Sequence, residues 1–133
     1  MERLEEIGIR SDDKRGVLLA YDFKQLSFEP KRIYFLKDVP PNLDRGFHAH
    51  KQLRQYFVAV SGSFDIRTYS TKGGWRTYSL NSTNLSLFVE SLTWRELSNF
   101  SSDAVCLVIA SEYYDPDDYI WSLKELENIA STN

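Results

Sequence analysis

Two histidines stand two residues apart in the segment Arg45-Gly-Phe-His-Ala-His-Lys51, and they are the only histidines in the chain. If this segment is a β-strand, side chains at positions i and i+2 leave the same face, so His48 and His50 point into one space. Two convergent imidazoles can hold a metal ion, or they can move protons near neutral pH. The residues that accompany the pair decide between these two chemistries.

The spacing after the pair is similar to the first motif of metal-binding cupins, small β-barrels in which His-x-His is followed by Glu and then Gly. Here Gln55 stands where that Glu would be, and Gly62 where the Gly would be. The second cupin motif, a His with an Asn four residues later, is matched by Arg95 and Asn99. Gln is a weak ligand compared with Glu, and a protonated Arg has no lone pair to donate. The sequence therefore predicts no metal site and leaves the histidines free to titrate.

Composition limits the class of protein. A chain of 133 residues with 42% hydrophobic and 14% aromatic residues is expected to form one globular domain, residues 1–133. The net charge of -3 argues against a general nucleic-acid binder. The charged start of the chain lacks a signal-peptide core, and no apolar run has transmembrane length, so we expect a cytoplasmic protein without membrane contact. Cys106, the only cysteine, lies in an apolar run and is expected to be a buried, inert thiol.

Short β-rich runs separated by turns dominate the chain. The predicted strands are 17–21, 32–36, 55–60, 64–69, 75–80, 85–89 and 105–109. Residues 61–63 and 72–74 read as hairpin turns. Asp115 followed by Pro116 is typical of a helix start, which predicts one helix over 119–129. Many short, evenly spaced strands indicate a sandwich or barrel.

Further sequence blocks extend the pattern over nearly the whole chain. In order they are Arg15-Gly-Val-Leu18, Lys31-Arg-Ile-Tyr34, Arg45 to Lys51 with Gln55, Gly62-Ser63, Trp94, Phe100 to Val105, Ala110-Ser-Glu-Tyr-Tyr-Asp115, and Asp118-Tyr-Ile120. In these blocks the chain resembles the dTDP-4-oxo-6-deoxyglucose 3,4-ketoisomerases, the family often labelled FdtA-like or WxcM-like. The Arg-Gly-x-His-Ala-His-Lys block is the most specific of them.

The resemblance implies an all-β cupin, or jelly-roll, barrel with a short C-terminal helix. It also implies a metal-free enzyme that forms a homodimer with exchanged N-terminal strands. The implied substrate is a 4-keto-6-deoxy sugar on thymidine diphosphate, whose carbonyl moves from C4 to C3. The product then serves the synthesis of a 3-amino-3,6-dideoxy sugar. No cofactor is expected, because the redox change is internal to the sugar.

The chemistry of an intramolecular ketone shift suits the histidine pair. A base must remove the C3 proton to give an enediol, and a proton must return at C4; imidazoles with a pKa near 6.5 suit both steps. We assign His50 as the main base and proton carrier. His48 would handle the sugar oxygens or share the shuttle, and the reverse order is also open.

Basic and polar residues of the family blocks are the candidates for substrate binding. Arg32, Arg45 and Lys51 are expected to bind the diphosphate. Tyr34 alternates onto the same face as Arg32 and could place its hydroxyl in the pocket, with Gln55 as a further contact.

The family positions that correspond to Arg15 and Arg95 vary in residue type, and the resemblance implies that they face the sugar. The C4 configuration of the product is left open. Two alternatives stay beside the ketoisomerase: an epimerase acting on a related dTDP-keto-sugar, and a non-catalytic cupin that binds a sugar nucleotide.

Overall fold

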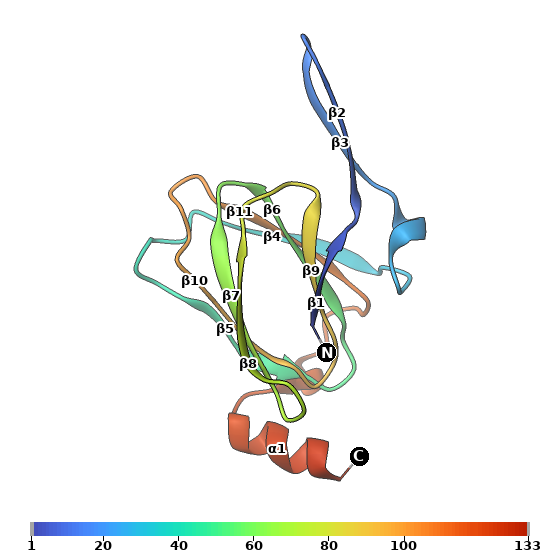
Figure 1. Ribbon diagram of the computed structural model, residues 1–133. Helices are drawn as coiled ribbons and strands as arrows, with labels where there is room; N and C mark the ends of the chain where they lie inside the picture. Colours follow the sequence, from blue (N-terminus) through green and yellow to red (C-terminus); the bar gives the residue numbers. More distant parts are fainter. Residues whose placement is uncertain (1, 133) are drawn as a thin grey trace.

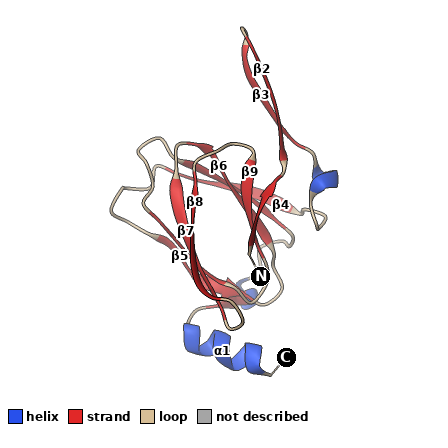
Figure 2. Cartoon of the chain, viewed as in Figure 1, coloured by secondary structure: helices blue, strands red, loops and turns tan. Residues whose placement is uncertain are grey.

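The computed structural model describes residues 2–132 as two five-stranded antiparallel sheets, a projecting hairpin and a C-terminal helix (Figure 1). One sheet has the strand order β1(Arg3–Glu6), β9(Leu85–Val89), β6(Gln55–Ser61), β11(Val105–Ala110), β4(Arg32–Lys37). The other has the order β12(Tyr119–Ile120), β5(Arg45–His50), β10(Trp94–Ser98), β7(Phe64–Ser70), β8(Gly74–Leu80). Strands dominate the whole chain (Figure 2). The predicted all-β jelly roll with a short C-terminal helix is confirmed.

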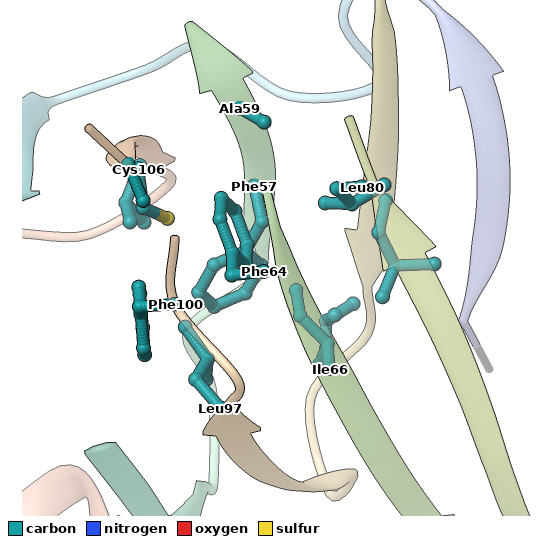
Figure 3. Close-up of a cluster of buried hydrophobic side chains, with 12 residues drawn as sticks. Phe57, Ala59, Phe64, Ile66, Leu80, Leu97, Phe100 and Cys106 are labelled. Atoms are coloured by element: carbon teal, nitrogen blue, oxygen red, sulfur yellow. The ribbon is translucent and has the colours of Figure 1, made fainter. Parts of the chain in front are cut away.

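The core forms where the two sheets face each other, because inward and outward residues alternate along the strands. In β7, Phe64 and Ile66 expose 1% or less of their surface. They pack with Phe57, Leu97 and further apolar side chains of both sheets (Figure 3). Each fully buried side chain of this kind contributes roughly 1.5–3 kcal/mol. Cys106 belongs to the same cluster, and burial raises the pKa of its thiol, which confirms the inert role expected for it.

The turn at 72–74 is confirmed, since it joins β7 and β8, which pair with each other. The predicted hairpin turn at 61–63 is wrong. It joins β6 to β7, which belong to different sheets, so the chain crosses the barrel there. Gly62 has a φ of +62°, and an added Cβ would lie 2.3 Å from Oγ of Ser101. The glycine therefore serves a tight corner between sheets rather than a hairpin.

The predicted helix over 119–129 is wrong at its start. Tyr119 and Ile120 form β12, which pairs with β5, and the helix α1 spans Leu123–Ser131. Ser122 caps it by accepting a hydrogen bond from the backbone amide of Glu125. Asp115 caps only the short 3-10 helix η2 (Pro116–Asp118). Pairing with β5 and complete burial of Ile120 overcome the local helix signal.

The N-terminal hairpin stands away from the barrel. Its strands β2 (Gly8–Asp13) and β3 (Gly16–Tyr21) pair only with each other among the described residues, and the hairpin extends beyond the body of the molecule (Figure 1). A second 3-10 helix, η1 (Phe23–Gln25), follows it. Within residues 2–132, no helix is long and apolar enough to cross a membrane.

Candidate active site

A cavity of about 290 Å³ opens between the two sheets. Its walls come from both sheets, so strands far apart in sequence contribute side chains to one space. β4 contributes alternate residues to it, and β5, β6, β10 and β12 supply most of the rest. The lining residues are Arg32, Tyr34, Leu36, Arg45, Gly46, His48, Gln55, Phe57, Arg95, Leu97, Tyr114 and Tyr119.

A β-bulge in β5 decides which of its side chains face the cavity. In the pairing with β10, His48 lies opposite Arg95 and Arg45 opposite Leu97, and the register shifts between these pairs. Phe47 is the extra residue, with a φ of +63°. Regular alternation would place Arg45 on the face opposite His48, whereas the bulge brings both to the cavity.

Gly46 makes the bulge possible. Its φ is +91°, and an added Cβ would lie 2.9 Å from the backbone oxygen of Arg95. Only glycine tolerates both the conformation and this close approach of two strands.

A directed chain of hydrogen bonds crosses the cavity floor. Arg95, which is 1% exposed, donates from Nη1 to Oε1 of Gln55 and, at 2.9 Å, from Nη2 to the carbonyl of Thr93. Since an arginine can only donate, the oxygen of the Gln55 amide must face it. The amide nitrogen of Gln55 therefore donates to the hydroxyl of Tyr34, at 2.9 Å. The Tyr34 oxygen accepts in this bond, so its own proton is free for a ligand oxygen.

The same floor carries positive charge. Burial lowers the pKa of Arg95 to about 10, which still leaves it charged at neutral pH. Arg32 and Arg45 add two more guanidinium groups, and within residues 2–132 no carboxylate lines the cavity. Burial raises the pKa of Tyr34, so its hydroxyl keeps its proton. The site therefore suits a ligand that carries, or develops, negative charge on oxygen.

The two histidines are adjacent but differ in access. Their ring centroids lie 4.9 Å apart with perpendicular planes, so the expected convergence is found. His48 lines the cavity, whereas His50 is 2% exposed and lies against the ring of Tyr119 at 4.5 Å. Nδ1 of His50 lies 3.1 Å from Oδ2 of the buried Asp118.

The environment keeps both imidazoles neutral. Burial and the charge of Arg95 lower the pKa of His48 to about 4, from an ordinary value of 6.5. Burial and the charge of Arg95, with smaller contributions from His48 and Arg32, hold the pKa of His50 well below its ordinary range. A neutral imidazole at the cavity wall can accept a proton at neutral pH.

Most of the predicted site residues meet in this cavity, and two do not. Arg32, Tyr34, Arg45, Gln55, Arg95 and His48 are brought together, and His50 lies directly behind them. Arg15 lies at the exposed tip of the β2–β3 hairpin, paired with Asp13 at 2.6 Å. Lys51 points away and donates to the backbone oxygen of Asp117 at 3.1 Å. Neither lines the cavity of its own chain.

Three residues of the C-terminal segment belong to the site although sequence reasoning did not select them. Tyr114 and Tyr119 line the cavity, and Asp118 contacts His50. The guanidinium of Arg32 lies 5.3 Å from the ring centroid of Tyr34 and 5.8 Å from that of Tyr114. The sequence could have identified them as site residues, because all three fall within the family blocks at 110–115 and 118–120.

Among the described residues, no group of three or more His, Cys, Asp or Glu side chains is placed to hold a metal ion. The side-chain oxygen of Gln55 accepts a hydrogen bond from Arg95, and its side-chain nitrogen donates one to Tyr34. A guanidinium thus occupies the floor where a third imidazole would serve a metal.

Known proteins resemble this chain in both sequence and structure. The family model described as FdtA, WxcM-like, C-terminal, matches residues 1–131. A TDP-4-oxo-6-deoxy-α-D-glucose-3,4-oxoisomerase from Aneurinibacillus thermoaerophilus is 41% identical over 110 residues, which cover 81% of this chain and 78% of that protein.

Two solved structures extend the likeness to the fold. One is a histidine-to-asparagine variant of a 3,4-ketoisomerase from Thermoanaerobacterium thermosaccharolyticum in complex with TDP-4-keto-6-deoxyglucose. It has a TM-score of 0.92 and 32% identity, and the match covers 99% of this chain and 95% of that one. The other is a 3,4-ketoisomerase from Helicobacter canadensis, with a TM-score of 0.89, 34% identity, and coverage of 98% and 97%.

Proposed function

Because this chain belongs to the FdtA family of WxcM-like, C-terminal domains, we propose that it is a sugar-nucleotide 3,4-ketoisomerase acting on TDP-4-keto-6-deoxyglucose. The relatives with this activity or this ligand are 32% and 41% identical over most of the chain. The observation that carries the proposal is the cavity itself, in which a neutral imidazole, a phenol that must donate, and a buried guanidinium meet. Those are the three groups that enolisation of a ketone needs.

The geometry favours His48 as the carbon base. It lines the cavity, whereas His50 lies behind it, so the roles first assigned to the two are best exchanged. His48 takes the C3 proton, the C3–H electron pair forms the C3=C4 double bond, and O4 receives a proton from Tyr34. In the second half His48 returns its proton to C4, O3 releases its proton to His50, and the carbonyl stands at C3. His50 then passes the O3 proton to the oxygen of Tyr34, which restores both side chains.

The charged side chains divide between the two halves of the substrate. Arg95, deep in the floor, stabilises the negative charge that develops on the enediol oxygens. Arg32 and Arg45, at the cavity wall, bind the diphosphate. Gln55 fixes the direction of the Tyr34 hydroxyl. No metal or other cofactor takes part in this scheme, and we place the reaction in the cytoplasm.

A homodimer forms part of the proposal. Val17 and Leu18 on the hairpin are 53% and 62% exposed, and Ile33 and Phe35 on the outer side of the edge strand β4 are both 54% exposed. A second copy would cover such apolar surface and an open sheet edge. Exchange of the hairpins would also carry Arg15 to the partner's substrate, which accounts for its distance from the cavity of its own chain.

The reaction is tested by incubating the purified protein with TDP-4-keto-6-deoxyglucose and following the carbonyl carbon by NMR in deuterated water. A ketoisomerase moves the carbonyl to C3 and a His48→Asn variant does not. An epimerase would leave the carbonyl at C4 while exchanging a ring proton. Binding without any change in the sugar would support a non-catalytic sugar-nucleotide cupin.

The dimer is tested by subunit mixing. Arg15→Ala and His48→Asn homodimers should both be impaired, and a mixed dimer should regain activity, because one of its two sites receives both native residues. Failure of mixing to restore turnover, with sedimentation showing dimers, would exclude the exchanged arrangement.

A further inference from the structure

Asp118, the last residue of η2, is buried beside the second histidine. The exposed fractions of the His50 and Asp118 side chains are 2% and 10%. Oδ2 of Asp118 lies 3.1 Å from Nδ1 of His50. The backbone amides of Gln52 and Leu53 also donate to this carboxylate, to Oδ1 at 2.8 Å and to Oδ2 at 3.3 Å. Three nitrogen atoms, one from the last residue of β5 and two from the turn that follows it, therefore converge on one carboxylate.

The polarity of this cluster is fixed by the backbone. An amide N–H can only donate, so both carboxylate oxygens act as acceptors and neither needs a proton of its own. A carboxylate that accepts throughout requires that Nδ1 of His50 carries the hydrogen. Nε2 then holds the free lone pair, and within residues 2–132 it has no hydrogen-bond partner.

The two backbone amides that bind the carboxylate are enough to hold the turn over residues 50–53. They do not explain why the same carboxylate also contacts the imidazole. β12 follows directly, and its pairing with β5 sets Tyr119 opposite His50. The ring of Tyr119 lies 4.5 Å from that of His50. One short segment thus fixes the edge of the imidazole through Asp118 and its face through Tyr119.

Resting on the proposed ketoisomerase function, we infer that Asp118 is a positioning residue that locks His50 in the Nδ1–H tautomer and so keeps Nε2 ready to accept and return the proton of the sugar oxygens. Asp118 does not touch the substrate. It acts only through the imidazole, as an orienting carboxylate does in other histidine-dependent enzymes.

Asp118→Asn reverses the polarity while keeping the shape. The Asn oxygen retains the shorter 2.8 Å bond from the Gln52 amide, and the longer 3.3 Å bond from the Leu53 amide is the one that is lost. The new amide nitrogen then faces Nδ1 of His50 and forces the hydrogen onto Nε2. Asp117→Asn is the matched control, since its side chain is exposed and makes no hydrogen bond to the histidines.

Long-range ¹H–¹⁵N NMR of protein labelled at histidine reads both tautomers directly. Only two imidazoles give signals, and a His48→Asn variant assigns them. The wild type and Asp117→Asn should show His50 protonated at Nδ1, and Asp118→Asn should show it protonated at Nε2. A wild-type spectrum with the hydrogen on Nε2 overturns the inference without any variant, even if Asp118→Asn does not fold.

Kinetics supply the second measurement. With TDP-4-keto-6-deoxyglucose, Asp118→Asn should lose at least about 100-fold in kcat, within the range that a wrong tautomer costs a catalytic histidine, with KM nearly unchanged. A merely structural carboxylate would lower Tm and leave the tautomer and kcat as they are, and an unchanged kcat beside a switched tautomer would also refute the role. If the wild type does not turn over this sugar, the proposed function fails, while the NMR result still decides the tautomer.

Discussion

The bulge in β5 can be tested by giving its glycine a side chain. Gly46→Ala places a methyl group at a φ of +91° and 2.9 Å from the backbone oxygen of Arg95. Gly74→Ala is the matched control, because Gly74 also has a positive φ, +69°, with nothing within 4 Å of an added Cβ. Gly74→Ala therefore introduces the backbone strain without the steric overlap.

The expected effects follow from these contacts. Backbone strain costs each variant about 1–2 kcal/mol of unfolding free energy. Overpacking against β10 costs Gly46→Ala about 1–3 kcal/mol more. With an unfolding entropy of about 2.1 cal/mol/K per residue, Tm of Gly46→Ala should lie about 4–10 °C below that of Gly74→Ala.

Calorimetry measures the difference in Tm, and the carbonyl-shift assay measures the functional consequence. Displacing β5 from β10 moves His48 relative to Arg95, so Gly46→Ala should also lose about 100-fold in kcat below its Tm, the scale of a misplacement near 1 Å. Gly74→Ala, on the β7–β8 hairpin, should keep its activity. Equal Tm losses in the two variants, or full activity of Gly46→Ala, would show that the bulge does not position the site.

Three further outcomes are expected. First, His48 acts as a neutral base with a pKa lowered to about 4, so kcat/KM should stay level as pH falls through 6.5 and drop only near 4; half-loss near 6.5 in protein that circular dichroism shows to be folded would contradict this. Second, Gln55→Glu replaces a hydrogen-bond donor to Tyr34 with an acceptor, so kcat should fall by about 100-fold. The new ion pair with Arg95 should keep Tm from falling. An unchanged kcat would show that Tyr34 is not the proton donor. Third, dialysis against EDTA should leave kcat unchanged, and a loss that added Zn²⁺, Mn²⁺ or Fe²⁺ restores would contradict the metal-free scheme.

The sequence predicts most strands and the convergence of the histidines, because both depend on a period of two along the chain. It fails where pairing with a distant strand decides the outcome. Tyr119 and Ile120 follow a good helix start yet extend along β5. Gly62 looks like a hairpin residue, but it packs against Ser101 at a corner between sheets. Neither partner can be identified from local sequence.

The side of β5 on which Arg45 emerges could not be read from periodicity either. One extra residue, Phe47, reverses the alternation upstream of His48. The hint in the sequence was Gly46, since a glycine inside a strand often marks a bulge or a close backbone approach. The assignment of different roles to the two histidines depended on their depth, because His48 and His50 share a face but His48 lines the cavity and His50 lies behind it.

The unpaired charge of Arg95 explains why this floor favours a reaction rather than tight binding of a neutral ketone. Arg95 is 1% exposed, its guanidinium donates hydrogen bonds only to Gln55 and Thr93 among residues 2–132, and its Nε has no hydrogen-bond partner there. A buried cation held only by neutral acceptors is poorly compensated. A neutral ketone cannot supply the missing counter-charge, whereas the negative charge that develops on O4 as the C3 proton passes to His48 does. The interaction therefore strengthens as the C3 proton leaves, and only interactions that strengthen in this way accelerate a chemical step.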